Sequence, residues 1–249
     1  MILDYLSEIY AELEERIDNI RALADVNEEL VAIAINNLRS LRTDVIATGR
    51  NQGILAKIDH QLEMYKQVAQ IPQLTTKFPI IREQSVVLII GTLEVFATDV
   101  MKAVGNNDPK LYVWNDPKEK ILVEPALISD EFTLGDAILS HLKLRGVSFQ
   151  DLQSLLRTFE TYLSVTIDVD KTDRDALVIG AAYRNVIVHN RSVVDRGFLK
   201  QIRGTTYFSA FESKNGENIK IDDDFVDALS LATRNLAAKI AGELIEHAD

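Results

Sequence analysis

The stretch RDALVIGAAYRNVIVHN, residues 174–190, determines how the rest of the chain has to be arranged. Apolar residues occupy nearly every face of the helix that their spacing predicts, so this helix belongs in the interior of a helical protein. Its last third nevertheless carries the polar side chains of Arg184, Asn185 and His189. Because polar groups are costly to bury without partners, either the fold satisfies them internally or a functional site uses them.

The three polar side chains can meet on one side of this helix. Successive helical residues are separated by about 100°, so Arg184, Asn185 and His189 fall within an arc of roughly 140°. The aliphatic stem of arginine is long enough to bring its guanidinium toward the histidine. Asn190 follows at once, and a loop with Gly197 lies just beyond. We therefore expect the three side chains to converge where a buried helix reaches the surface.

These residue types suit the cleavage of RNA. Histidine gains and loses a proton near neutral pH, and arginine holds a phosphate through two parallel hydrogen bonds. Asparagine can orient either the imidazole ring or the substrate. The 2′-hydroxyl of RNA supplies an internal nucleophile, so a histidine and an arginine could cleave the strand without a metal ion. Since each chain contributes one such histidine, a two-fold homodimer would supply both a base and an acid.

A structural role for the same residues is the alternative. An Arg-Asn pair near a helix end can hold backbone carbonyls or a neighbouring acid, and a single histidine can be a core group with satisfied hydrogen bonds. On this hypothesis the protein is a non-catalytic helical module that binds a partner protein. The two hypotheses differ in whether the three side chains are open to solvent or sealed by internal hydrogen bonds.

The segment Arg184-Asn185-Val-Ile-Val-His189 resembles the signature of HEPN-domain ribonucleases, in which an arginine, often followed by a polar residue, precedes a histidine by a few positions. The continuation HNRSVVDRGF, residues 189–198, is similar to versions found in prokaryotic defence and toxin families, including the RiboL-PSP-HEPN group. The resemblance implies a helical bundle with the motif on a late helix. It also implies a metal-independent endoribonuclease without a cofactor, acting as a homodimer in toxin–antitoxin or anti-phage defence, with a possible antitoxin or defence-system partner.

Glu94 is a supporting candidate. It is the one acid in the apolar stretch VVLIIGTLEVFA, residues 86–97, which resembles the earlier core helix of the family that often carries an acid. Glu94 could pair with Arg184 and orient the guanidinium. It could equally form an ion pair of purely structural value, and both roles remain open at this stage.

The rest of the chain reads as helices with one small β-hairpin. Asn215-Gly216 is a hairpin turn signal between residues 205–213 and 218–221. A capping-box pattern at Asp25–Glu28 predicts that a second helix begins at these residues. The expected fold class is mainly α: a HEPN-like helical bundle with an N-terminal helical extension. A short strand near residues 121–123 is also possible. The apolar spacing predicts helices over residues 2–24, 28–49, 54–68, 82–104, 134–144, 149–163, 174–190 and 225–244.

The proline-containing segment IPQLTTKFP, residues 71–79, predicts a boundary between two regions. Residues 1–71 form an N-terminal helical region that we expect to serve dimerisation or partner binding. Residues 80–249 form the HEPN-like helical domain.

Composition limits the possible functions. The chain has 249 residues, 47% of them hydrophobic, and no cysteine, which excludes a disulfide framework and a thiolate metal site. A net charge of −11 argues against a free-standing duplex-DNA binder, so any contact with nucleic acid has to be focused on a local surface. His60, His141 and His247 are isolated, and the acidic loop 168–175 lacks the glycine and glutamate of a calcium loop. We therefore expect no metal site.

The N-terminal residues lack the basic leader of a signal peptide, and the longest apolar stretch is too short to span a bilayer. We expect a cytoplasmic protein that does not contact the membrane.

Overall fold

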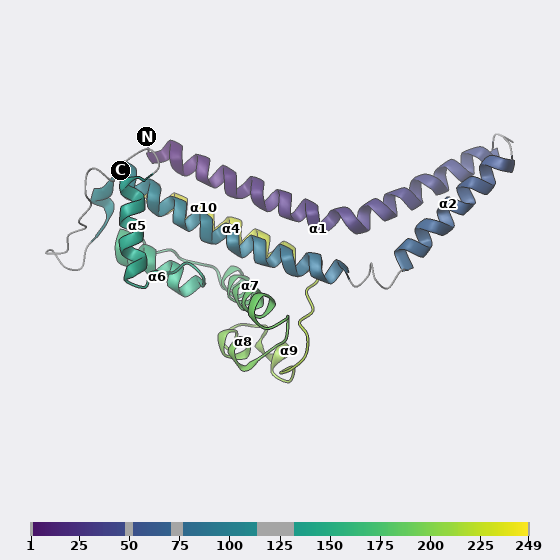
Figure 1. Ribbon diagram of the computed structural model, residues 1–249. Helices are drawn as coiled ribbons and strands as arrows, with labels where there is room; N and C mark the ends of the chain where they lie inside the picture. The colour runs from purple at the N-terminus through teal and green to yellow at the C-terminus, as the bar shows by residue number, and fades with distance from the viewer. Residues whose placement is uncertain (1, 48–51, 71–76, 114–131, 249) are drawn as a thin grey trace.

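The computed structural model describes residues 2–47, 52–70, 77–113 and 132–248. Within these ranges the protein is helical and contains no strand, which confirms the predicted helical class (Figure 1). In chain order the elements are α1 (Ile2–Ala47), α2 (Gln52–Gln70), α4 (Lys77–Asn107), the 3-10 helix η1 (Pro109–Leu111), α5 (Leu134–Leu144), α6 (Leu152–Leu163), α7 (Lys171–His189), α8 (Arg196–Gln201), α9 (Phe208–Phe211) and α10 (Asp223–Ala248).

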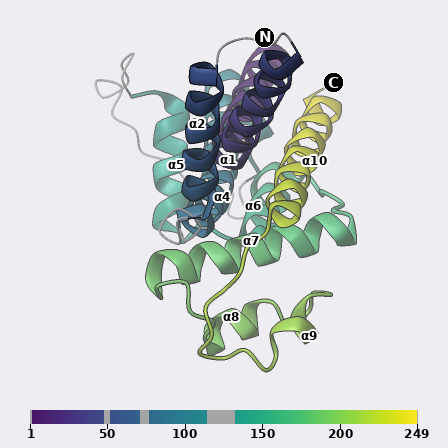
Figure 2. The ribbon, with the colours of Figure 1, turned by 90° about the vertical axis from the view of Figure 1, so that its right-hand side faces the viewer.

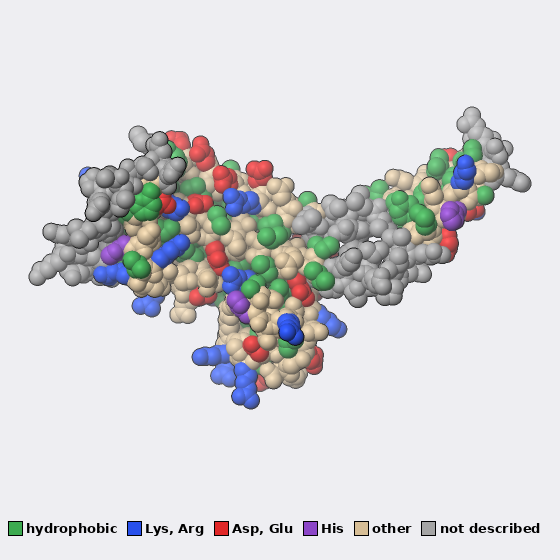
Figure 3. Space-filling model, in the orientation of Figure 1, with side chains coloured by type: hydrophobic (Ala, Val, Ile, Leu, Met, Phe, Trp, Pro, Cys, Tyr) green, Lys and Arg blue, Asp and Glu red, His purple; other side chains and the backbone are tan. Residues whose placement is uncertain are grey.

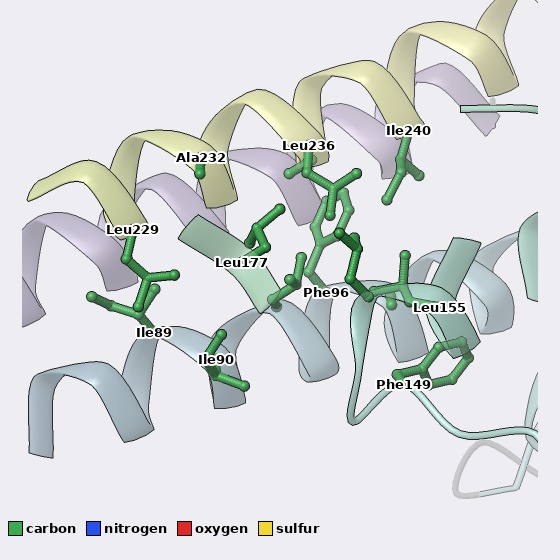
Figure 4. Packing of buried hydrophobic residues seen from close by; sticks show 14 of the residues in the cluster. Ile89, Ile90, Phe96, Phe149, Leu155, Leu177, Leu229, Ala232, Leu236 and Ile240 are labelled. Carbon is green, nitrogen blue, oxygen red and sulfur yellow. The ribbon is translucent and has the colours of Figure 1, made fainter. Parts of the chain in front are cut away.

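The core lies where α4, α7 and α10 meet. Figure 2 shows α7 crossing these longer helices, with α8 and α9 on its other side. Figure 4 shows apolar side chains of α10 directed toward α4, with Leu177 of α7 between the two helices. Leu177, Ile179 and Ala182 of α7 are almost completely removed from solvent. The prediction that the apolar helix around residues 174–190 is buried is therefore confirmed for its central turns.

The first half of α1 belongs to the same core. Leu6, Leu13 and Ile17 are buried against α4 and α10. Arg234 of α10 pairs with carboxylates of α1, its Nη2 lying 2.6 Å from Asp18 Oδ1. The division of the chain near residues 71–80 stays a prediction, but these contacts join the first turns of α1 to the helices of the C-terminal region.

The second half of α1 forms an antiparallel arm with α2 that extends away from the body (Figure 1). Its small core consists of Val45, Ile58 and Leu62. The predicted break at Asp25–Glu28 is wrong, because α1 is continuous from Ile2 to Ala47. Polar residues in a helix interior cost only a few tenths of a kcal/mol each, so a capping pattern alone does not end a helix.

The predicted β-hairpin is also wrong. Gly216 does sit in a turn, with a φ of 91°, but residues before it form the short helix α9. The chain after the turn instead bonds to the loop that follows α7: Val194 N donates to Glu217 O, and Ile219 N donates to Ser192 O. The reason is aromatic packing, since a helical turn directs the Phe211 ring against Tyr183 and Phe198, at centroid distances of 6.0 Å and 5.3 Å.

Smaller differences concern helix ends. Pro79 lies inside α4, in its first turn, where a missing N–H costs nothing because that N–H has no intrahelical partner. The helix α6 begins at Leu152 because Asp151 caps it by accepting from Ser154 N at 2.8 Å. The possible strand near residues 121–123 lies outside the described residues.

Two glycines allow α4 and α5 to approach closely. A Cβ on Gly105 of α4 would lie 2.8 Å from the Cα of Gly135 at the start of α5. A Cβ on Gly135 would overlap the carbonyl oxygen of Lys102, and Gly135 N donates to Asn106 Oδ1 at 2.6 Å. The obstacle is backbone and cannot rotate away, so the contact requires glycine.

We predict that Gly135→Ala lowers the free energy of unfolding by about 2 kcal/mol, because α5 has to move away from α4 to admit the methyl group. Gly242→Ala is the matched control. Gly242 is exposed in α10 with open space around it, so alanine there should raise stability by about 0.5–1 kcal/mol. Urea unfolding followed by circular dichroism measures both variants. Equal effects of the two substitutions would contradict the close α4–α5 contact.

Candidate functional site

The end of α7 emerges from the core where the predicted site residues lie. Its middle residues from Leu177 to Tyr183 are buried apart from Val178, whereas Arg184 and Asn185 are half-buried and His189 is exposed. The start of α7 is held by pairing with α10, since Asp170 accepts from Lys239 Nζ at 2.8 Å. The expected arrangement, in which polar groups appear where a buried helix reaches the surface, is what the burial pattern shows.

Arg184 and Asn185 contact one another directly. Arg184 Nη1 donates to Asn185 Oδ1 at 3.3 Å, and Asn185 Nδ2 donates to Gln201 Oε1 at 3.3 Å. The amide of Asn185 therefore links the guanidinium to α8. In the described part of the chain Arg184 has no further hydrogen bond or ion pair, so most of its N–H groups remain available to a ligand.

His189 is not joined to the other two residues. Neither of its ring nitrogens has a hydrogen-bond partner among the described residues, and its side chain is exposed. The expected approach of the guanidinium to the histidine is thus not made through a hydrogen bond within one chain. The structure brings Arg184 and Asn185 together and leaves His189 exposed, one helical turn after Asn185.

Glu94 lies on α4 near the guanidinium of Arg184. Its Oε1 is buried without a hydrogen-bond partner, and no direct ion pair joins it to Arg184 in the described residues. Burial raises the pKa of Glu94 above its ordinary value, and the positive charge of Arg184 only partly opposes this. The charge of Arg184 therefore reaches Glu94 without a hydrogen bond between the two side chains.

The loop after α7 is fixed in an unusual conformation. Arg191 and Ser192 both have positive φ angles, 53° and 62°, which non-glycine residues rarely adopt. Ser192 Oγ donates to Glu83 Oε2 of α4 at 2.7 Å, and Asn190 Nδ2 donates to Val193 O at 2.7 Å. These bonds hold the chain in a sharp turn directly beyond His189. Such strained turns persist only where the surroundings enforce them.

A basic surface surrounds this end of α7. Figure 3 shows Lys and Arg side chains gathered over α8, at the bottom of the view. Residues 184–214 contain Asp195 and Glu212 as their only acids, and Asp195 is engaged in capping α8. The positive residues of the same span are Arg184, Arg191, Arg196, Lys200, Arg203 and Lys214. The chain as a whole is acidic, so this concentration of positive charge is local.

Sequence reasoning did not identify the contributions of Gln201 and of α8. The amide of Gln201 is sixteen positions from Asn185, so only the packing of α8 on α7 brings them together. The run of spaced basic residues from Arg191 to Arg203 was a visible signal in the sequence. It could have been recognised by comparing the local charge with the charge of the whole chain.

The other predicted features lie apart from this end of α7. His60 is exposed on the arm, and His141 is half-buried on α5; the side chain of His247 lies outside the described residues. Among the described residues no group of His, Asp and Glu side chains is placed to hold a metal ion. In the same residues no helix is both long and apolar enough to cross a bilayer.

Comparison with protein-family models, with curated proteins and with solved structures finds no match to this chain.

We predict that Glu94→Gln raises the free energy of unfolding at pH 7. The folded state keeps the proton of Glu94 to a higher pH than the unfolded chain does, so the buried carboxyl destabilises the fold increasingly as the pH rises above about 4. The gain should shrink as the pH falls toward 4. Urea unfolding between pH 4 and pH 7 measures it, with Glu160→Gln as the control for net charge. A loss of stability at pH 7 would mean that attraction to Arg184 outweighs burial.

Proposed function

We propose that the protein is a metal-independent endoribonuclease of the HEPN type. The observation that carries the proposal is a half-buried Arg184 with unused N–H donors and, five residues further along the same helix, an exposed His189. A local concentration of positive charge on an acidic chain suits focused binding of RNA. The resemblance of residues 184–198 to defence and toxin families supports a role in toxin–antitoxin or anti-phage systems, with an antitoxin or defence-system protein as a possible partner.

The proposed reaction is an internal transesterification of RNA. The 2′-oxygen attacks the adjacent phosphorus as a base removes its proton, and the bond from phosphorus to the 5′-oxygen breaks as an acid protonates that oxygen. The products are a 2′,3′-cyclic phosphate and a 5′-hydroxyl end. Arg184 stabilises the charge that builds up on the phosphate oxygens, and Asn185 orients the guanidinium. His189 transfers a proton.

A homodimer supplies the second proton-transfer group in this proposal. Leu88 and Val95 of α4 are seven residues apart, hence on one stripe of the helix, and both are strongly exposed, at 46% and 40%. Val188, one turn after Arg184, is 50% exposed. Figure 3 shows hydrophobic side chains along α4 on the face that also carries the end of α7. A second copy on this face would bring two copies of His189 toward one cleft.

We predict that His189→Ala and Arg184→Ala each reduce RNA cleavage in the presence of EDTA by about 100-fold or more, with circular dichroism unchanged. His60→Ala and Arg174→Ala remove the same residue types from exposed positions elsewhere and should retain full activity. The assay follows a labelled RNA and analyses its new ends. Undiminished cleavage by the His189→Ala protein would refute the proposal.

We predict that Leu88→Glu converts the dimer into a monomer and abolishes cleavage, because a charge in the apolar face opposes association. Leu231→Glu is the control, since Leu231 is 58% exposed on α10 and outside this face. Light scattering coupled to size-exclusion chromatography gives the mass of each variant. An active Leu88→Glu monomer would show that one chain contains the whole catalytic apparatus.

The alternative, a non-catalytic helical interaction module, is favoured by a different observation. The arm exposes large apolar side chains that its small core does not use, among them Ile33, Leu41 and Met64. Such side chains suit contact with another protein. Absence of cleavage by the wild-type protein, together with binding that depends on these residues, would favour the module.

A further inference from the structure

A polar cavity lies between the end of α5 and the outer face of α6. It has a volume of about 350 Å³, within the range of small-molecule sites. Two guanidinium groups line it, from Arg145 and Arg157, together with the hydroxyls of Ser148 and Thr161. Val147 and Tyr162 are among the other residues that line it. None of these residues belongs to α7 or to the basic surface around its end.

The backbone around the cavity is well defined. Gly146 has a φ of 84°, a left-handed conformation that ends α5, and Val147 N donates to Leu142 O at 3.1 Å. Phe149 is buried in the main core and holds the connection in place. Asp151 then caps α6. The connection is therefore anchored at both ends, and the cavity is part of the folded structure.

The chemistry of the lining is cationic. Of the described residues, none with a carboxylate lines the cavity. Arg157 is exposed and forms no ion pair within the described ranges, so its charge is not neutralised by the protein. Ser148 Oγ accepts from Gln150 N at 3.2 Å, which leaves its own hydrogen to donate. Figure 3 shows further Lys and Arg side chains gathered over α5, at the left of the view.

We propose that this cavity binds the phosphate monoester of a small organic molecule, of the size of a mononucleotide or a sugar phosphate. Arginine binds phosphate oxygens through two parallel hydrogen bonds and keeps its charge, and hydroxyl groups donate to the remaining oxygens. The volume exceeds what phosphate alone needs, and Val147 and Tyr162 offer an apolar wall for the organic part. The proposal does not depend on the ribonuclease activity, because it uses other residues.

The test is calorimetric titration of the full-length protein with AMP, ribose 5-phosphate, inorganic phosphate and adenosine at matched ionic strength in chloride buffer. We expect AMP and ribose 5-phosphate to bind once per chain with dissociation constants of about 1 mM or tighter, and adenosine not to bind. Arg157→Gln and Arg145→Gln should each weaken binding by about tenfold or more. Arg174→Gln removes an exposed arginine of α7 and should bind as the wild type does.

Three results would overturn the proposal: no heat from either phosphate ester, equal binding of adenosine and AMP, or unchanged binding by the Arg157→Gln protein. Loss of RNA binding in Arg157→Gln without any binding of the small esters would also overturn it, because the surface would then serve a macromolecule. Circular dichroism checks that each variant is folded. Since the cleavage assay uses different residues, its failure leaves this titration unaffected.

Discussion

The close packing of α7 between α4 and α10 is the constraint on which the rest of the structure depends. At Gly180 there is no room for a side chain, since a Cβ would lie 3.0 Å or less from Leu229 and 3.1 Å from Ile90. The three helices are therefore in van der Waals contact at the middle of α7. A helix held this tightly cannot rotate or slide, so the direction in which its last turns leave the core is fixed.

That constraint accounts for the position of the polar residues. The interior accepts the apolar turns of α7 and excludes Arg184, Asn185 and His189, whose burial without partners would cost several kcal/mol. Arg184 lies near Glu94 of α4, Asn185 contacts Gln201 of α8, and His189 is exposed at the end of α7. The aromatic contacts of Tyr183 with Phe198 and Phe225, at 5.6 Å and 5.0 Å, hold α8 and the start of α10 against α7. The candidate site is thus supported by the same packing that makes the core.

Positive and negative charges are unevenly distributed over the surface of the protein. The chain is acidic, and some of its carboxylates form ion pairs that join α1 to α10 or cap helices. Among the described residues, arginine and lysine side chains gather around the end of α7, and two arginines, Arg145 and Arg157, lie at the α5–α6 connection. Local positive charge of this kind attracts anionic ligands to these two regions of an otherwise acidic chain.

The sequence alone determined the helical class, the burial of residues 174–190 and the appearance of polar groups at one end of that helix, because helical periodicity and burial costs act over a few residues. It also contained the turn signal at Asn215-Gly216, and Gly216 does lie in a turn. Only the tertiary structure decided that Phe211 lies on a helix and that Asn185 meets Gln201. Both depend on contacts between segments distant in the chain, and such contacts outweigh local preferences of a few tenths of a kcal/mol. The helix α1 runs unbroken past Asp25 because polar residues weaken a helix interior only by amounts of that size.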